Sequence, residues 1–108
     1  MWINSFNGYL MINSNYLKNG DKVDVYLDLV HELVHVKQFL EGKQLFDNNY
    51  AYVDRPTEIE AYKYTVKEAR RLGLKDERIC LYLKTECMTY RDLEKLAKTL
   101  KIKCETYR

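Results

Sequence analysis

The sequence has few residues that interrupt regular structure. Its 108 residues include one proline and four glycines, which excludes collagen-like, proline-rich and low-complexity classes. It also lacks an apolar run of the roughly 18 to 20 residues that a membrane-spanning helix needs. With 46% hydrophobic and 31% charged residues, the composition is typical of a soluble globular protein. The length predicts a single domain over residues 1–108.

An excess of charge of one sign is also missing. The 18 Lys and Arg residues against 16 Asp and Glu residues give a formal net charge of +2, which is too small to predict nucleic-acid binding. The segment from Thr89 to Arg108 carries six basic and three acidic residues. Because the two signs are interleaved, a solvated helix face is the better interpretation of this segment. We therefore expect no nucleic-acid partner.

Cysteine is scarce, and no two cysteines have CxxC spacing. The chain has three, which are Cys80, Cys87 and Cys104. An odd number without paired spacing favours reduced, unreactive thiols over a disulfide framework. The first residues, Met1 to Asn7, lack the basic start and long apolar stretch of a secretory signal. Both observations predict a cytoplasmic protein.

Hydrophobic periodicity predicts an α+β fold that is mostly α. The short apolar run from Gly8 to Asn13 predicts an N-terminal strand or ribbon, and Asn13 to Asn19 has the polar character of a loop. Apolar residues then recur every three or four positions between a predicted N-cap at Asp21 and a stop at Gly42. The stretch from Lys43 to Arg55 shows no helical period and predicts a loop.

Three further helices are predicted in the second half of the chain. Thr57 and Glu60 form a candidate capping box for the first, which ends at Gly73. Asp76 is the predicted cap of the second helix, and Thr89 of the third. The apolar face of the third helix consists of Leu93, Leu96, Ala97 and Leu100. Residues 101–108 resemble a tail.

The residues that carry chemistry lie on the first long helix, in the motif His31-Glu32-Leu33-Val34-His35. Residues four apart on an α-helix lie one above the other, so the two imidazoles can reach a single Zn²⁺. Glu32 stands beside them and can hold a water molecule without ligating the metal. The chain has only two histidines, so a chance pair on an amphipathic helix is the weaker interpretation.

A catalytic zinc site needs a third protein ligand and one open position. No third histidine exists, and the next helix offers Glu58 and Glu60, which lie about 200° apart around its axis. Glu58 shares its face with small or apolar residues, whereas Glu60 shares its face with mostly charged ones. We therefore predict that Glu58 joins the two histidines around one zinc ion per chain, with Glu60 as the alternative.

The segment HELVHVKQ, followed by Glu58 in TEIEAY, resembles the gluzincin clan of zinc peptidases, in which a second helix supplies a glutamate ligand. The spacing of Glu58 and Ala61 is similar to the E-x-x-A of membrane-embedded gluzincins, although Tyr62 stands where those have an Asp that orients a zinc-binding His. A Tyr hydroxyl or a backbone carbonyl is expected to substitute. The short chain resembles the minigluzincins, which are soluble single-domain proteins from thermophilic prokaryotes. The resemblance covers residues 8–73.

This resemblance implies a zinc metalloendopeptidase that acts on a peptide or protein substrate. Glu32 is then the general base that activates the attacking water and passes a proton to the leaving amine. The strand at residues 8–13 is the implied upper rim of a cleft, where it pairs with an extended peptide. Candidates for stabilising the oxyanion, among which the sequence leaves the choice open, are Tyr50, Tyr52, Arg55, Tyr62 and Tyr90.

The resemblance also implies latency, in which residues 89–108 block the cleft within one chain or by exchange of a helix in a homodimer. Cys104 or Glu105 would then occupy the open metal position. The alternative is that this helix completes the core. The absence of an Asp after Ala61 and of an oxyanion His supports a second function, a zinc-binding scaffold or interaction protein with little or no hydrolytic activity.

Overall fold

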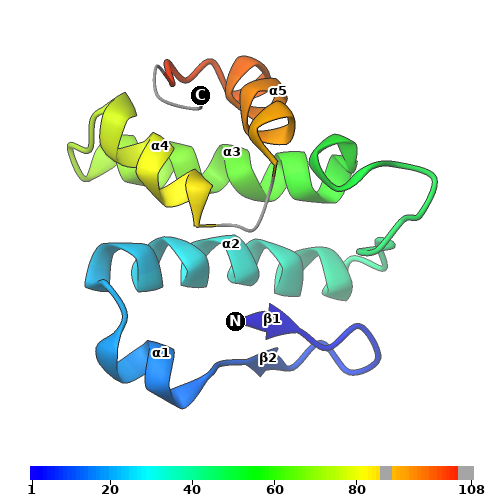
Figure 1. The fold of residues 1–108 in the computed structure, drawn as a ribbon. Coiled ribbons are helices and arrows are strands. Elements are labelled where there is room, and N and C mark those ends of the chain that lie inside the picture. Colours follow the sequence, from blue (N-terminus) through cyan, green and yellow to red (C-terminus); the bar gives the residue numbers. More distant parts are fainter. Residues whose placement is uncertain (86–88, 105–108) are drawn as a thin grey trace.

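The structure is a computed structural model that describes residues 1–85 and 89–104. In this part of the chain, five α-helices follow a two-stranded antiparallel ribbon, which confirms the predicted α+β, mostly α, class. Figure 1 shows that the ribbon (β1, Trp2–Ile3; β2, Leu10–Met11) lies on one side of α2 (Lys22–Leu40), whereas α3 (Pro56–Arg71), α4 (Asp76–Lys84) and α5 (Tyr90–Leu100) lie on the other. None of the described helices has the length and apolarity needed to cross a membrane.

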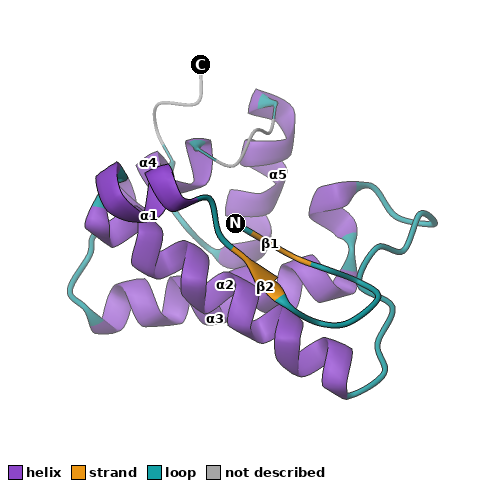
Figure 2. Cartoon of the chain, turned by 90° about the horizontal axis from the view of Figure 1, so that it is seen from below, coloured by secondary structure: helices purple, strands orange, loops and turns teal. Residues whose placement is uncertain are grey.

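The ribbon is shorter than the apolar run predicted. Only Leu10 and Met11 form β2, and they pair with Ile3 and Trp2, respectively. The turn between the strands brings Gly8, at φ +74°, so close to Phe39 that an added Cβ would lie 2.5 Å from its ring. A side chain at this position would therefore push the ribbon away from α2. Figure 2 shows the ribbon lying over α2.

The segment after the ribbon is a helix, α1 (Ser14–Asn19), so the prediction of a loop from Asn13 to Asn19 is wrong. The side chain of Asn13 caps the helix by accepting a hydrogen bond from the backbone N–H of Tyr16. The hydroxyl of Tyr16 in turn donates to the carboxylate of Asp28 on α2. The six residues of α1 are mostly polar and show no helical period in the sequence. Their helix is stabilised by its contact with α2.

Helix α2 has the boundaries that its sequence predicts. The side chain of Asp21 accepts a hydrogen bond from the backbone N–H of Asp24, which confirms the N-cap. Gly42 adopts φ +78° just beyond the helix, as expected for a left-handed stop. The buried positions of α2 are Leu27, His31, His35 and Gln38. Three of these four are polar, so the helix turns hydrogen-bonding groups toward its neighbour.

Helix α3 follows a short 3₁₀-helix (Tyr52–Asp54) and begins without the predicted capping box. Pro56 occupies the first helical position, where its fixed φ suits the first turn. The two residues of the expected capping box bind other groups: the hydroxyl of Thr57 donates to the carbonyl of Leu45, and the carboxylate of Glu60 accepts from Gln38. Ala61 lies on the buried face of α3, where its small side chain lets α2 and α3 approach closely.

Helices α4 and α5 complete the core. The hydroxyl of Thr89 accepts a hydrogen bond from the N–H of Asp92, which confirms that cap. Asp76 is not the cap of α4; Lys75 holds that position, and the Asp76 carboxylate accepts from the N–H of Lys103. All four apolar residues predicted for the face of α5 are buried, which supports the interpretation that this helix finishes the core.

A disulfide joins Cys80 of α4 to Cys104, so the expectation of reduced thiols is wrong for these two residues. Cys87 lies outside the described residues. The chain turns back at Lys101, at φ 57°, and brings Ile102 and Cys104 into the core, so residues 101–104 are not a free tail. A separation of 24 residues gives no local signal in the sequence, because only the turn after α5 brings the two sulfurs together.

Reduction of the Cys80–Cys104 disulfide is expected to lower the free energy of unfolding by about 3 kcal/mol, because it releases a closed loop in the unfolded chain. Urea denaturation with and without dithiothreitol measures this difference. The double variant Cys80→Ala/Cys104→Ala should not respond to the reductant. Three free thiols in the purified native protein, together with a urea midpoint that dithiothreitol does not change, would contradict the disulfide.

Candidate metal centre

Three side chains with metal-ligating atoms meet between α2 and α3. His31 and His35 project from successive turns of α2, and Glu58 projects from the first turn of α3. Their exposed fractions are 4%, 6% and 4%, respectively. Together they form the one group in the described part of the chain that could hold a metal ion. We call these three residues the His–His–Glu cluster.

The ligand-type atoms of the cluster form a small triangle. Oε1 of Glu58 lies 2.9 Å from Nε2 of His31 and 2.8 Å from Nε2 of His35, and the two nitrogens are 3.2 Å apart. In a tetrahedral zinc site with bonds of about 2.0–2.2 Å, neighbouring ligand atoms are about 3.3–3.5 Å apart. The observed distances are slightly shorter because both imidazoles hydrogen-bond to the carboxylate. The three atoms are close enough to surround a single ion, at separations shorter than such an ion would impose.

The carboxylate of Glu58 is buried against both imidazoles. Burial by itself raises the pKa of Glu58, but hydrogen bonds from the two histidines outweigh it and bring that pKa to about 2. Burial lowers the pKa of His35, but the hydrogen bond and charge of Glu58 outweigh this effect and raise the pKa overall. Glu58 is therefore ionised, as a metal ligand must be, and protons compete with a metal for His35.

The two histidines differ in the contacts of their other ring nitrogen. Nδ1 of His35 lies 2.7 Å from the amide oxygen of Gln38, which can only accept, so this nitrogen carries a proton. Nδ1 of His31 is buried and has no hydrogen-bond partner among the described residues. The ring of His31 packs against that of Tyr62 instead, with 4.3 Å between centroids.

Tyr62 does not replace the orienting Asp for His31. Its hydroxyl shares a hydrogen bond of 2.9 Å with the hydroxyl of Tyr52, and within residues 1–85 and 89–104 neither a hydroxyl nor a backbone carbonyl hydrogen-bonds to Nδ1 of His31. The expectation of such a substitute is therefore wrong for this histidine. For His35 the partner is a side-chain amide of the same helix. A polar residue three positions after His35, on the same buried stripe as both histidines, is the signal by which sequence reasoning could have found Gln38.

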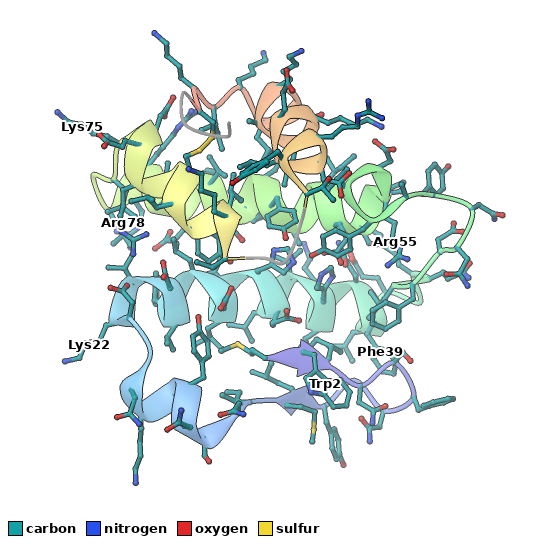
Figure 3. The ribbon with its side chains drawn as sticks, in the orientation of Figure 1. Trp2, Lys22, Phe39, Arg55, Lys75 and Arg78 are labelled. Carbon is teal, nitrogen blue, oxygen red and sulfur yellow. A yellow bond between two sulfur atoms is a disulfide. The ribbon has the colours of Figure 1, made fainter. Side chains whose placement is uncertain are left out.

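Glu32 lies beside the cluster at the wall of a small cavity. The cavity has a volume of about 70 Å³ and is lined by Trp2, Ile3, Glu32, His35, Leu45 and Phe46. Figure 3 shows Trp2 on the ribbon side of α2. Burial raises the pKa of Glu32 to about 7, the charge of His35 lowers it in part, and the charge of Glu58 adds to the rise. The cavity is therefore bounded by a carboxyl group that exchanges its proton near neutral pH.

The remaining predicted candidates lie elsewhere. Glu60 is partly exposed, and its carboxylate bonds to Gln38 rather than to either histidine. Cys104 cannot reach a metal because its sulfur is bonded to Cys80, and Glu105 lies outside the described residues. Of the oxyanion candidates, Tyr50 and Tyr90 are exposed, and Arg55 donates to the carbonyl of Asp47. Tyr62 contacts the cluster through its ring, and the hydroxyl of Tyr52 hydrogen-bonds to that of Tyr62.

No protein-family model, curated protein or solved structure matches this chain. The resemblance to the minigluzincins therefore stays a prediction based on the motif. What the structure adds is the geometry of the cluster.

The cluster is expected to hold a divalent metal ion; with zinc as the probe, Glu58→Gln is expected to weaken binding by more than the roughly 10- to 100-fold typical of an outer-shell substitution. Glu60→Gln should retain full stoichiometry, because its amide oxygen can still accept from Gln38. Elemental analysis and competition with a chromogenic chelator measure both quantities. Loss of zinc from Glu60→Gln with retention in Glu58→Gln would reverse the assignment.

The metal-free protein is expected to lose stability as pH rises from about 4.5 to about 7, because the folded state holds the Glu32 proton more tightly than the unfolded chain does. Glu32→Gln should remove this loss and make the metal-free protein roughly 3 kcal/mol more stable than wild type at pH 8. Near pH 4 the two should be equally stable. Urea denaturation in a chelator across this range tests the difference, and parallel curves for the two proteins would contradict it.

Proposed function

We propose that the chain is a zinc-dependent metalloendopeptidase. The observation that carries the proposal is the convergence of two buried imidazoles and one buried carboxylate beside the half-buried carboxyl group of Glu32. In this proposal His31, His35 and Glu58 hold the metal. Glu32 is the general base.

Zinc is the metal that best suits this set of donor atoms. Two imidazole nitrogens and one carboxylate oxygen, with a fourth position left open, make up the ligand set of one class of catalytic zinc site. When bound, zinc lowers the pKa of a coordinated water and polarises the substrate carbonyl. The deep burial of the three residues supports this role, because a buried cluster of ionisable groups is costly unless it is fully paired or binds a metal.

Glu32 is placed to move a proton. It follows His31 directly in the chain and lines the same cavity as His35, yet it makes no hydrogen bond to the cluster that would occupy its carboxylate. In the proposed reaction it accepts a proton from the attacking water and donates it to the amine of the leaving peptide. Glu58 stays ionised throughout.

The ribbon is the proposed docking edge for a peptide or protein substrate. The residues that line the cavity include Trp2 and Ile3 of β1 and none from residues 8–13, so β1 rather than β2 lies next to Glu32. An extended peptide can add to a strand edge through main-chain hydrogen bonds. In this proposal β1 forms the rim that the resemblance assigned to residues 8–13.

The structure of residues 89–104 gives little support to a C-terminal segment that blocks the cleft. Helix α5 buries its apolar face in the core of its own chain and packs on α3, on the side of α2 away from the ribbon (Figure 1). A homodimer formed by helix exchange would reproduce this packing between two chains, and we keep it as a proposal. Residues 105–108, to which a blocking role could also fall, lie outside the described residues.

The disulfide bears on the proposed cellular location. Disulfides are rare in the cytosol of mesophiles but occur inside cells of hyperthermophiles. We therefore propose a cytoplasmic location only together with the thermophilic source that the resemblance implies.

A zinc-binding scaffold or interaction protein is the second candidate function. Two observations favour it: Nδ1 of His31 lacks a partner among the described residues, and the cavity of about 70 Å³ is much smaller than the roughly 300–1,000 Å³ of typical ligand sites. A site that binds metal without admitting a substrate would have these features.

Substitution of the base separates the two functions. We expect the zinc-loaded wild type to cleave an unstructured protein such as casein, and Glu32→Gln to lower the rate at least about 100-fold while zinc content stays at one per chain. Mass spectrometry of the products and elemental analysis give the two readouts. Equal residual cleavage by both proteins would assign the activity to a contaminant.

If neither the full chain nor a variant shortened after Cys104 cleaves any substrate while both retain zinc, the scaffold function is correct.

A further inference from the structure

A single buried amide connects the His–His–Glu cluster to the surface of α3. Gln38 is 0% exposed, and each end of its side-chain amide is hydrogen-bonded. Its oxygen lies 2.7 Å from Nδ1 of His35. Its nitrogen donates to the carbonyl of Thr57 at 3.0 Å and to Oε1 of Glu60 at 2.8 Å.

These partners allow only one orientation of the amide. The Thr57 carbonyl and the Glu60 carboxylate can only accept hydrogen bonds, so the amide nitrogen must face them. Rotating the amide by 180° would place its oxygen against two other oxygens and remove the donor that both acceptors share. The amide oxygen must therefore face His35, and Nδ1 of His35 must carry the proton.

We propose that Gln38 and Glu60 are positioning residues that hold His35 in the tautomer and ring orientation in which Nε2 offers its lone pair to the metal. The inference rests on the proposed metal site. Neither residue touches the metal position; Gln38 acts through His35, and Glu60 acts through Gln38. Metal-binding histidines commonly donate their second ring N–H to an acceptor that fixes them in this way.

The arrangement predicts different behaviour for the two histidines. His35 is held by a hydrogen bond, whereas His31 is held by packing against the ring of Tyr62. Removing Gln38 should therefore disturb the protonation pattern of His35 and leave that of His31 unchanged. A loss of general packing would affect both rings alike.

The arrangement also gives Glu60 a role that is neither ligand nor cap. Its carboxylate is partly exposed and lies 3.5 Å from Nζ of Lys43, so water and Lys43 solvate one side while Gln38 binds the other. Because the Thr57 carbonyl also holds the amide nitrogen, removing Glu60 should loosen the amide without releasing it. We expect a smaller effect from Glu60 than from Gln38.

Zinc affinity, measured by competition with a chromogenic chelator, tests the proposal. Gln38→Leu is expected to bind zinc about 10- to 100-fold more weakly than wild type, and Glu60→Ala a few-fold more weakly. Glu60→Gln should bind normally because its amide oxygen still accepts. Glu68→Ala is the matched control: this glutamate also lies on α3 but pairs with Arg71 and Tyr26, so its loss should leave zinc affinity unchanged.

Long-range ¹H–¹⁵N spectra of the zinc-loaded proteins provide the second readout. In wild type, the Nδ1 proton of His35 should exchange slowly with water, because it is buried and bonded to Gln38. In Gln38→Leu this protection should disappear while the ring signals of His31 stay in place. In Glu60→Ala the exchange should accelerate without complete loss of the proton signal.

The outcomes are distinguishable. If wild type binds no zinc, the proposed function itself is wrong. If wild type binds zinc and folded Gln38→Leu binds equally tightly with an unchanged His35 spectrum, the positioning role is wrong. Equal disturbance of both histidines would mean that Gln38 only packs. Should Gln38→Leu fail to unfold cooperatively in chelator, Glu60→Ala decides, and an unchanged affinity and exchange rate there would overturn the proposal.

Discussion

The carboxylate of Glu58 constrains the whole structure. Two histidines of the neighbouring helix contact the same oxygen of this carboxylate. Ionised groups lose their hydration when buried, and the loss is recovered only if their partners are close and well oriented. Nitrogen–oxygen distances of 2.9 and 2.8 Å therefore fix the register of α3 against α2. Ala61, on the next turn of α3 after Glu58, is fully buried and leaves room for this close approach. The cluster and the packing of the two helices depend on each other.

The cost of burying polar groups here is offset elsewhere in the chain. Helix α2 places His31, His35 and Gln38 where apolar residues would fill a conventional core, and burial of Glu32 opposes its ionised form. On the other side of α3, the core is strongly apolar, with α4, α5 and residues 102–104 contributing most of its members. The Cys80–Cys104 disulfide ties that half together. The fold thus separates a polar interface, which carries the candidate metal centre, from an apolar one that provides stability.

The sequence signals that correctly predicted helix boundaries were local ones. Asp21 and Thr89 cap their helices, and Gly42 follows the end of α2, because each depends on backbone groups within a few residues. The expected capping box at Thr57 and Glu60 failed because other elements bind both side chains. Helix α1 was missed because its anchor, from Tyr16 to Asp28, lies in the next helix.

The sequence alone determined that His31 and His35 share one stripe of a helix and that Glu58, not Glu60, belongs to the inward face of the next, since helical periodicity sets both. Only the tertiary structure decided how near these faces come, which nitrogen of His35 carries its proton, and that Cys80 meets Cys104. Each of those facts joins residues from different elements. Their contacts arise from how the helices pack, and a linear pattern does not encode the packing of one helix face on another.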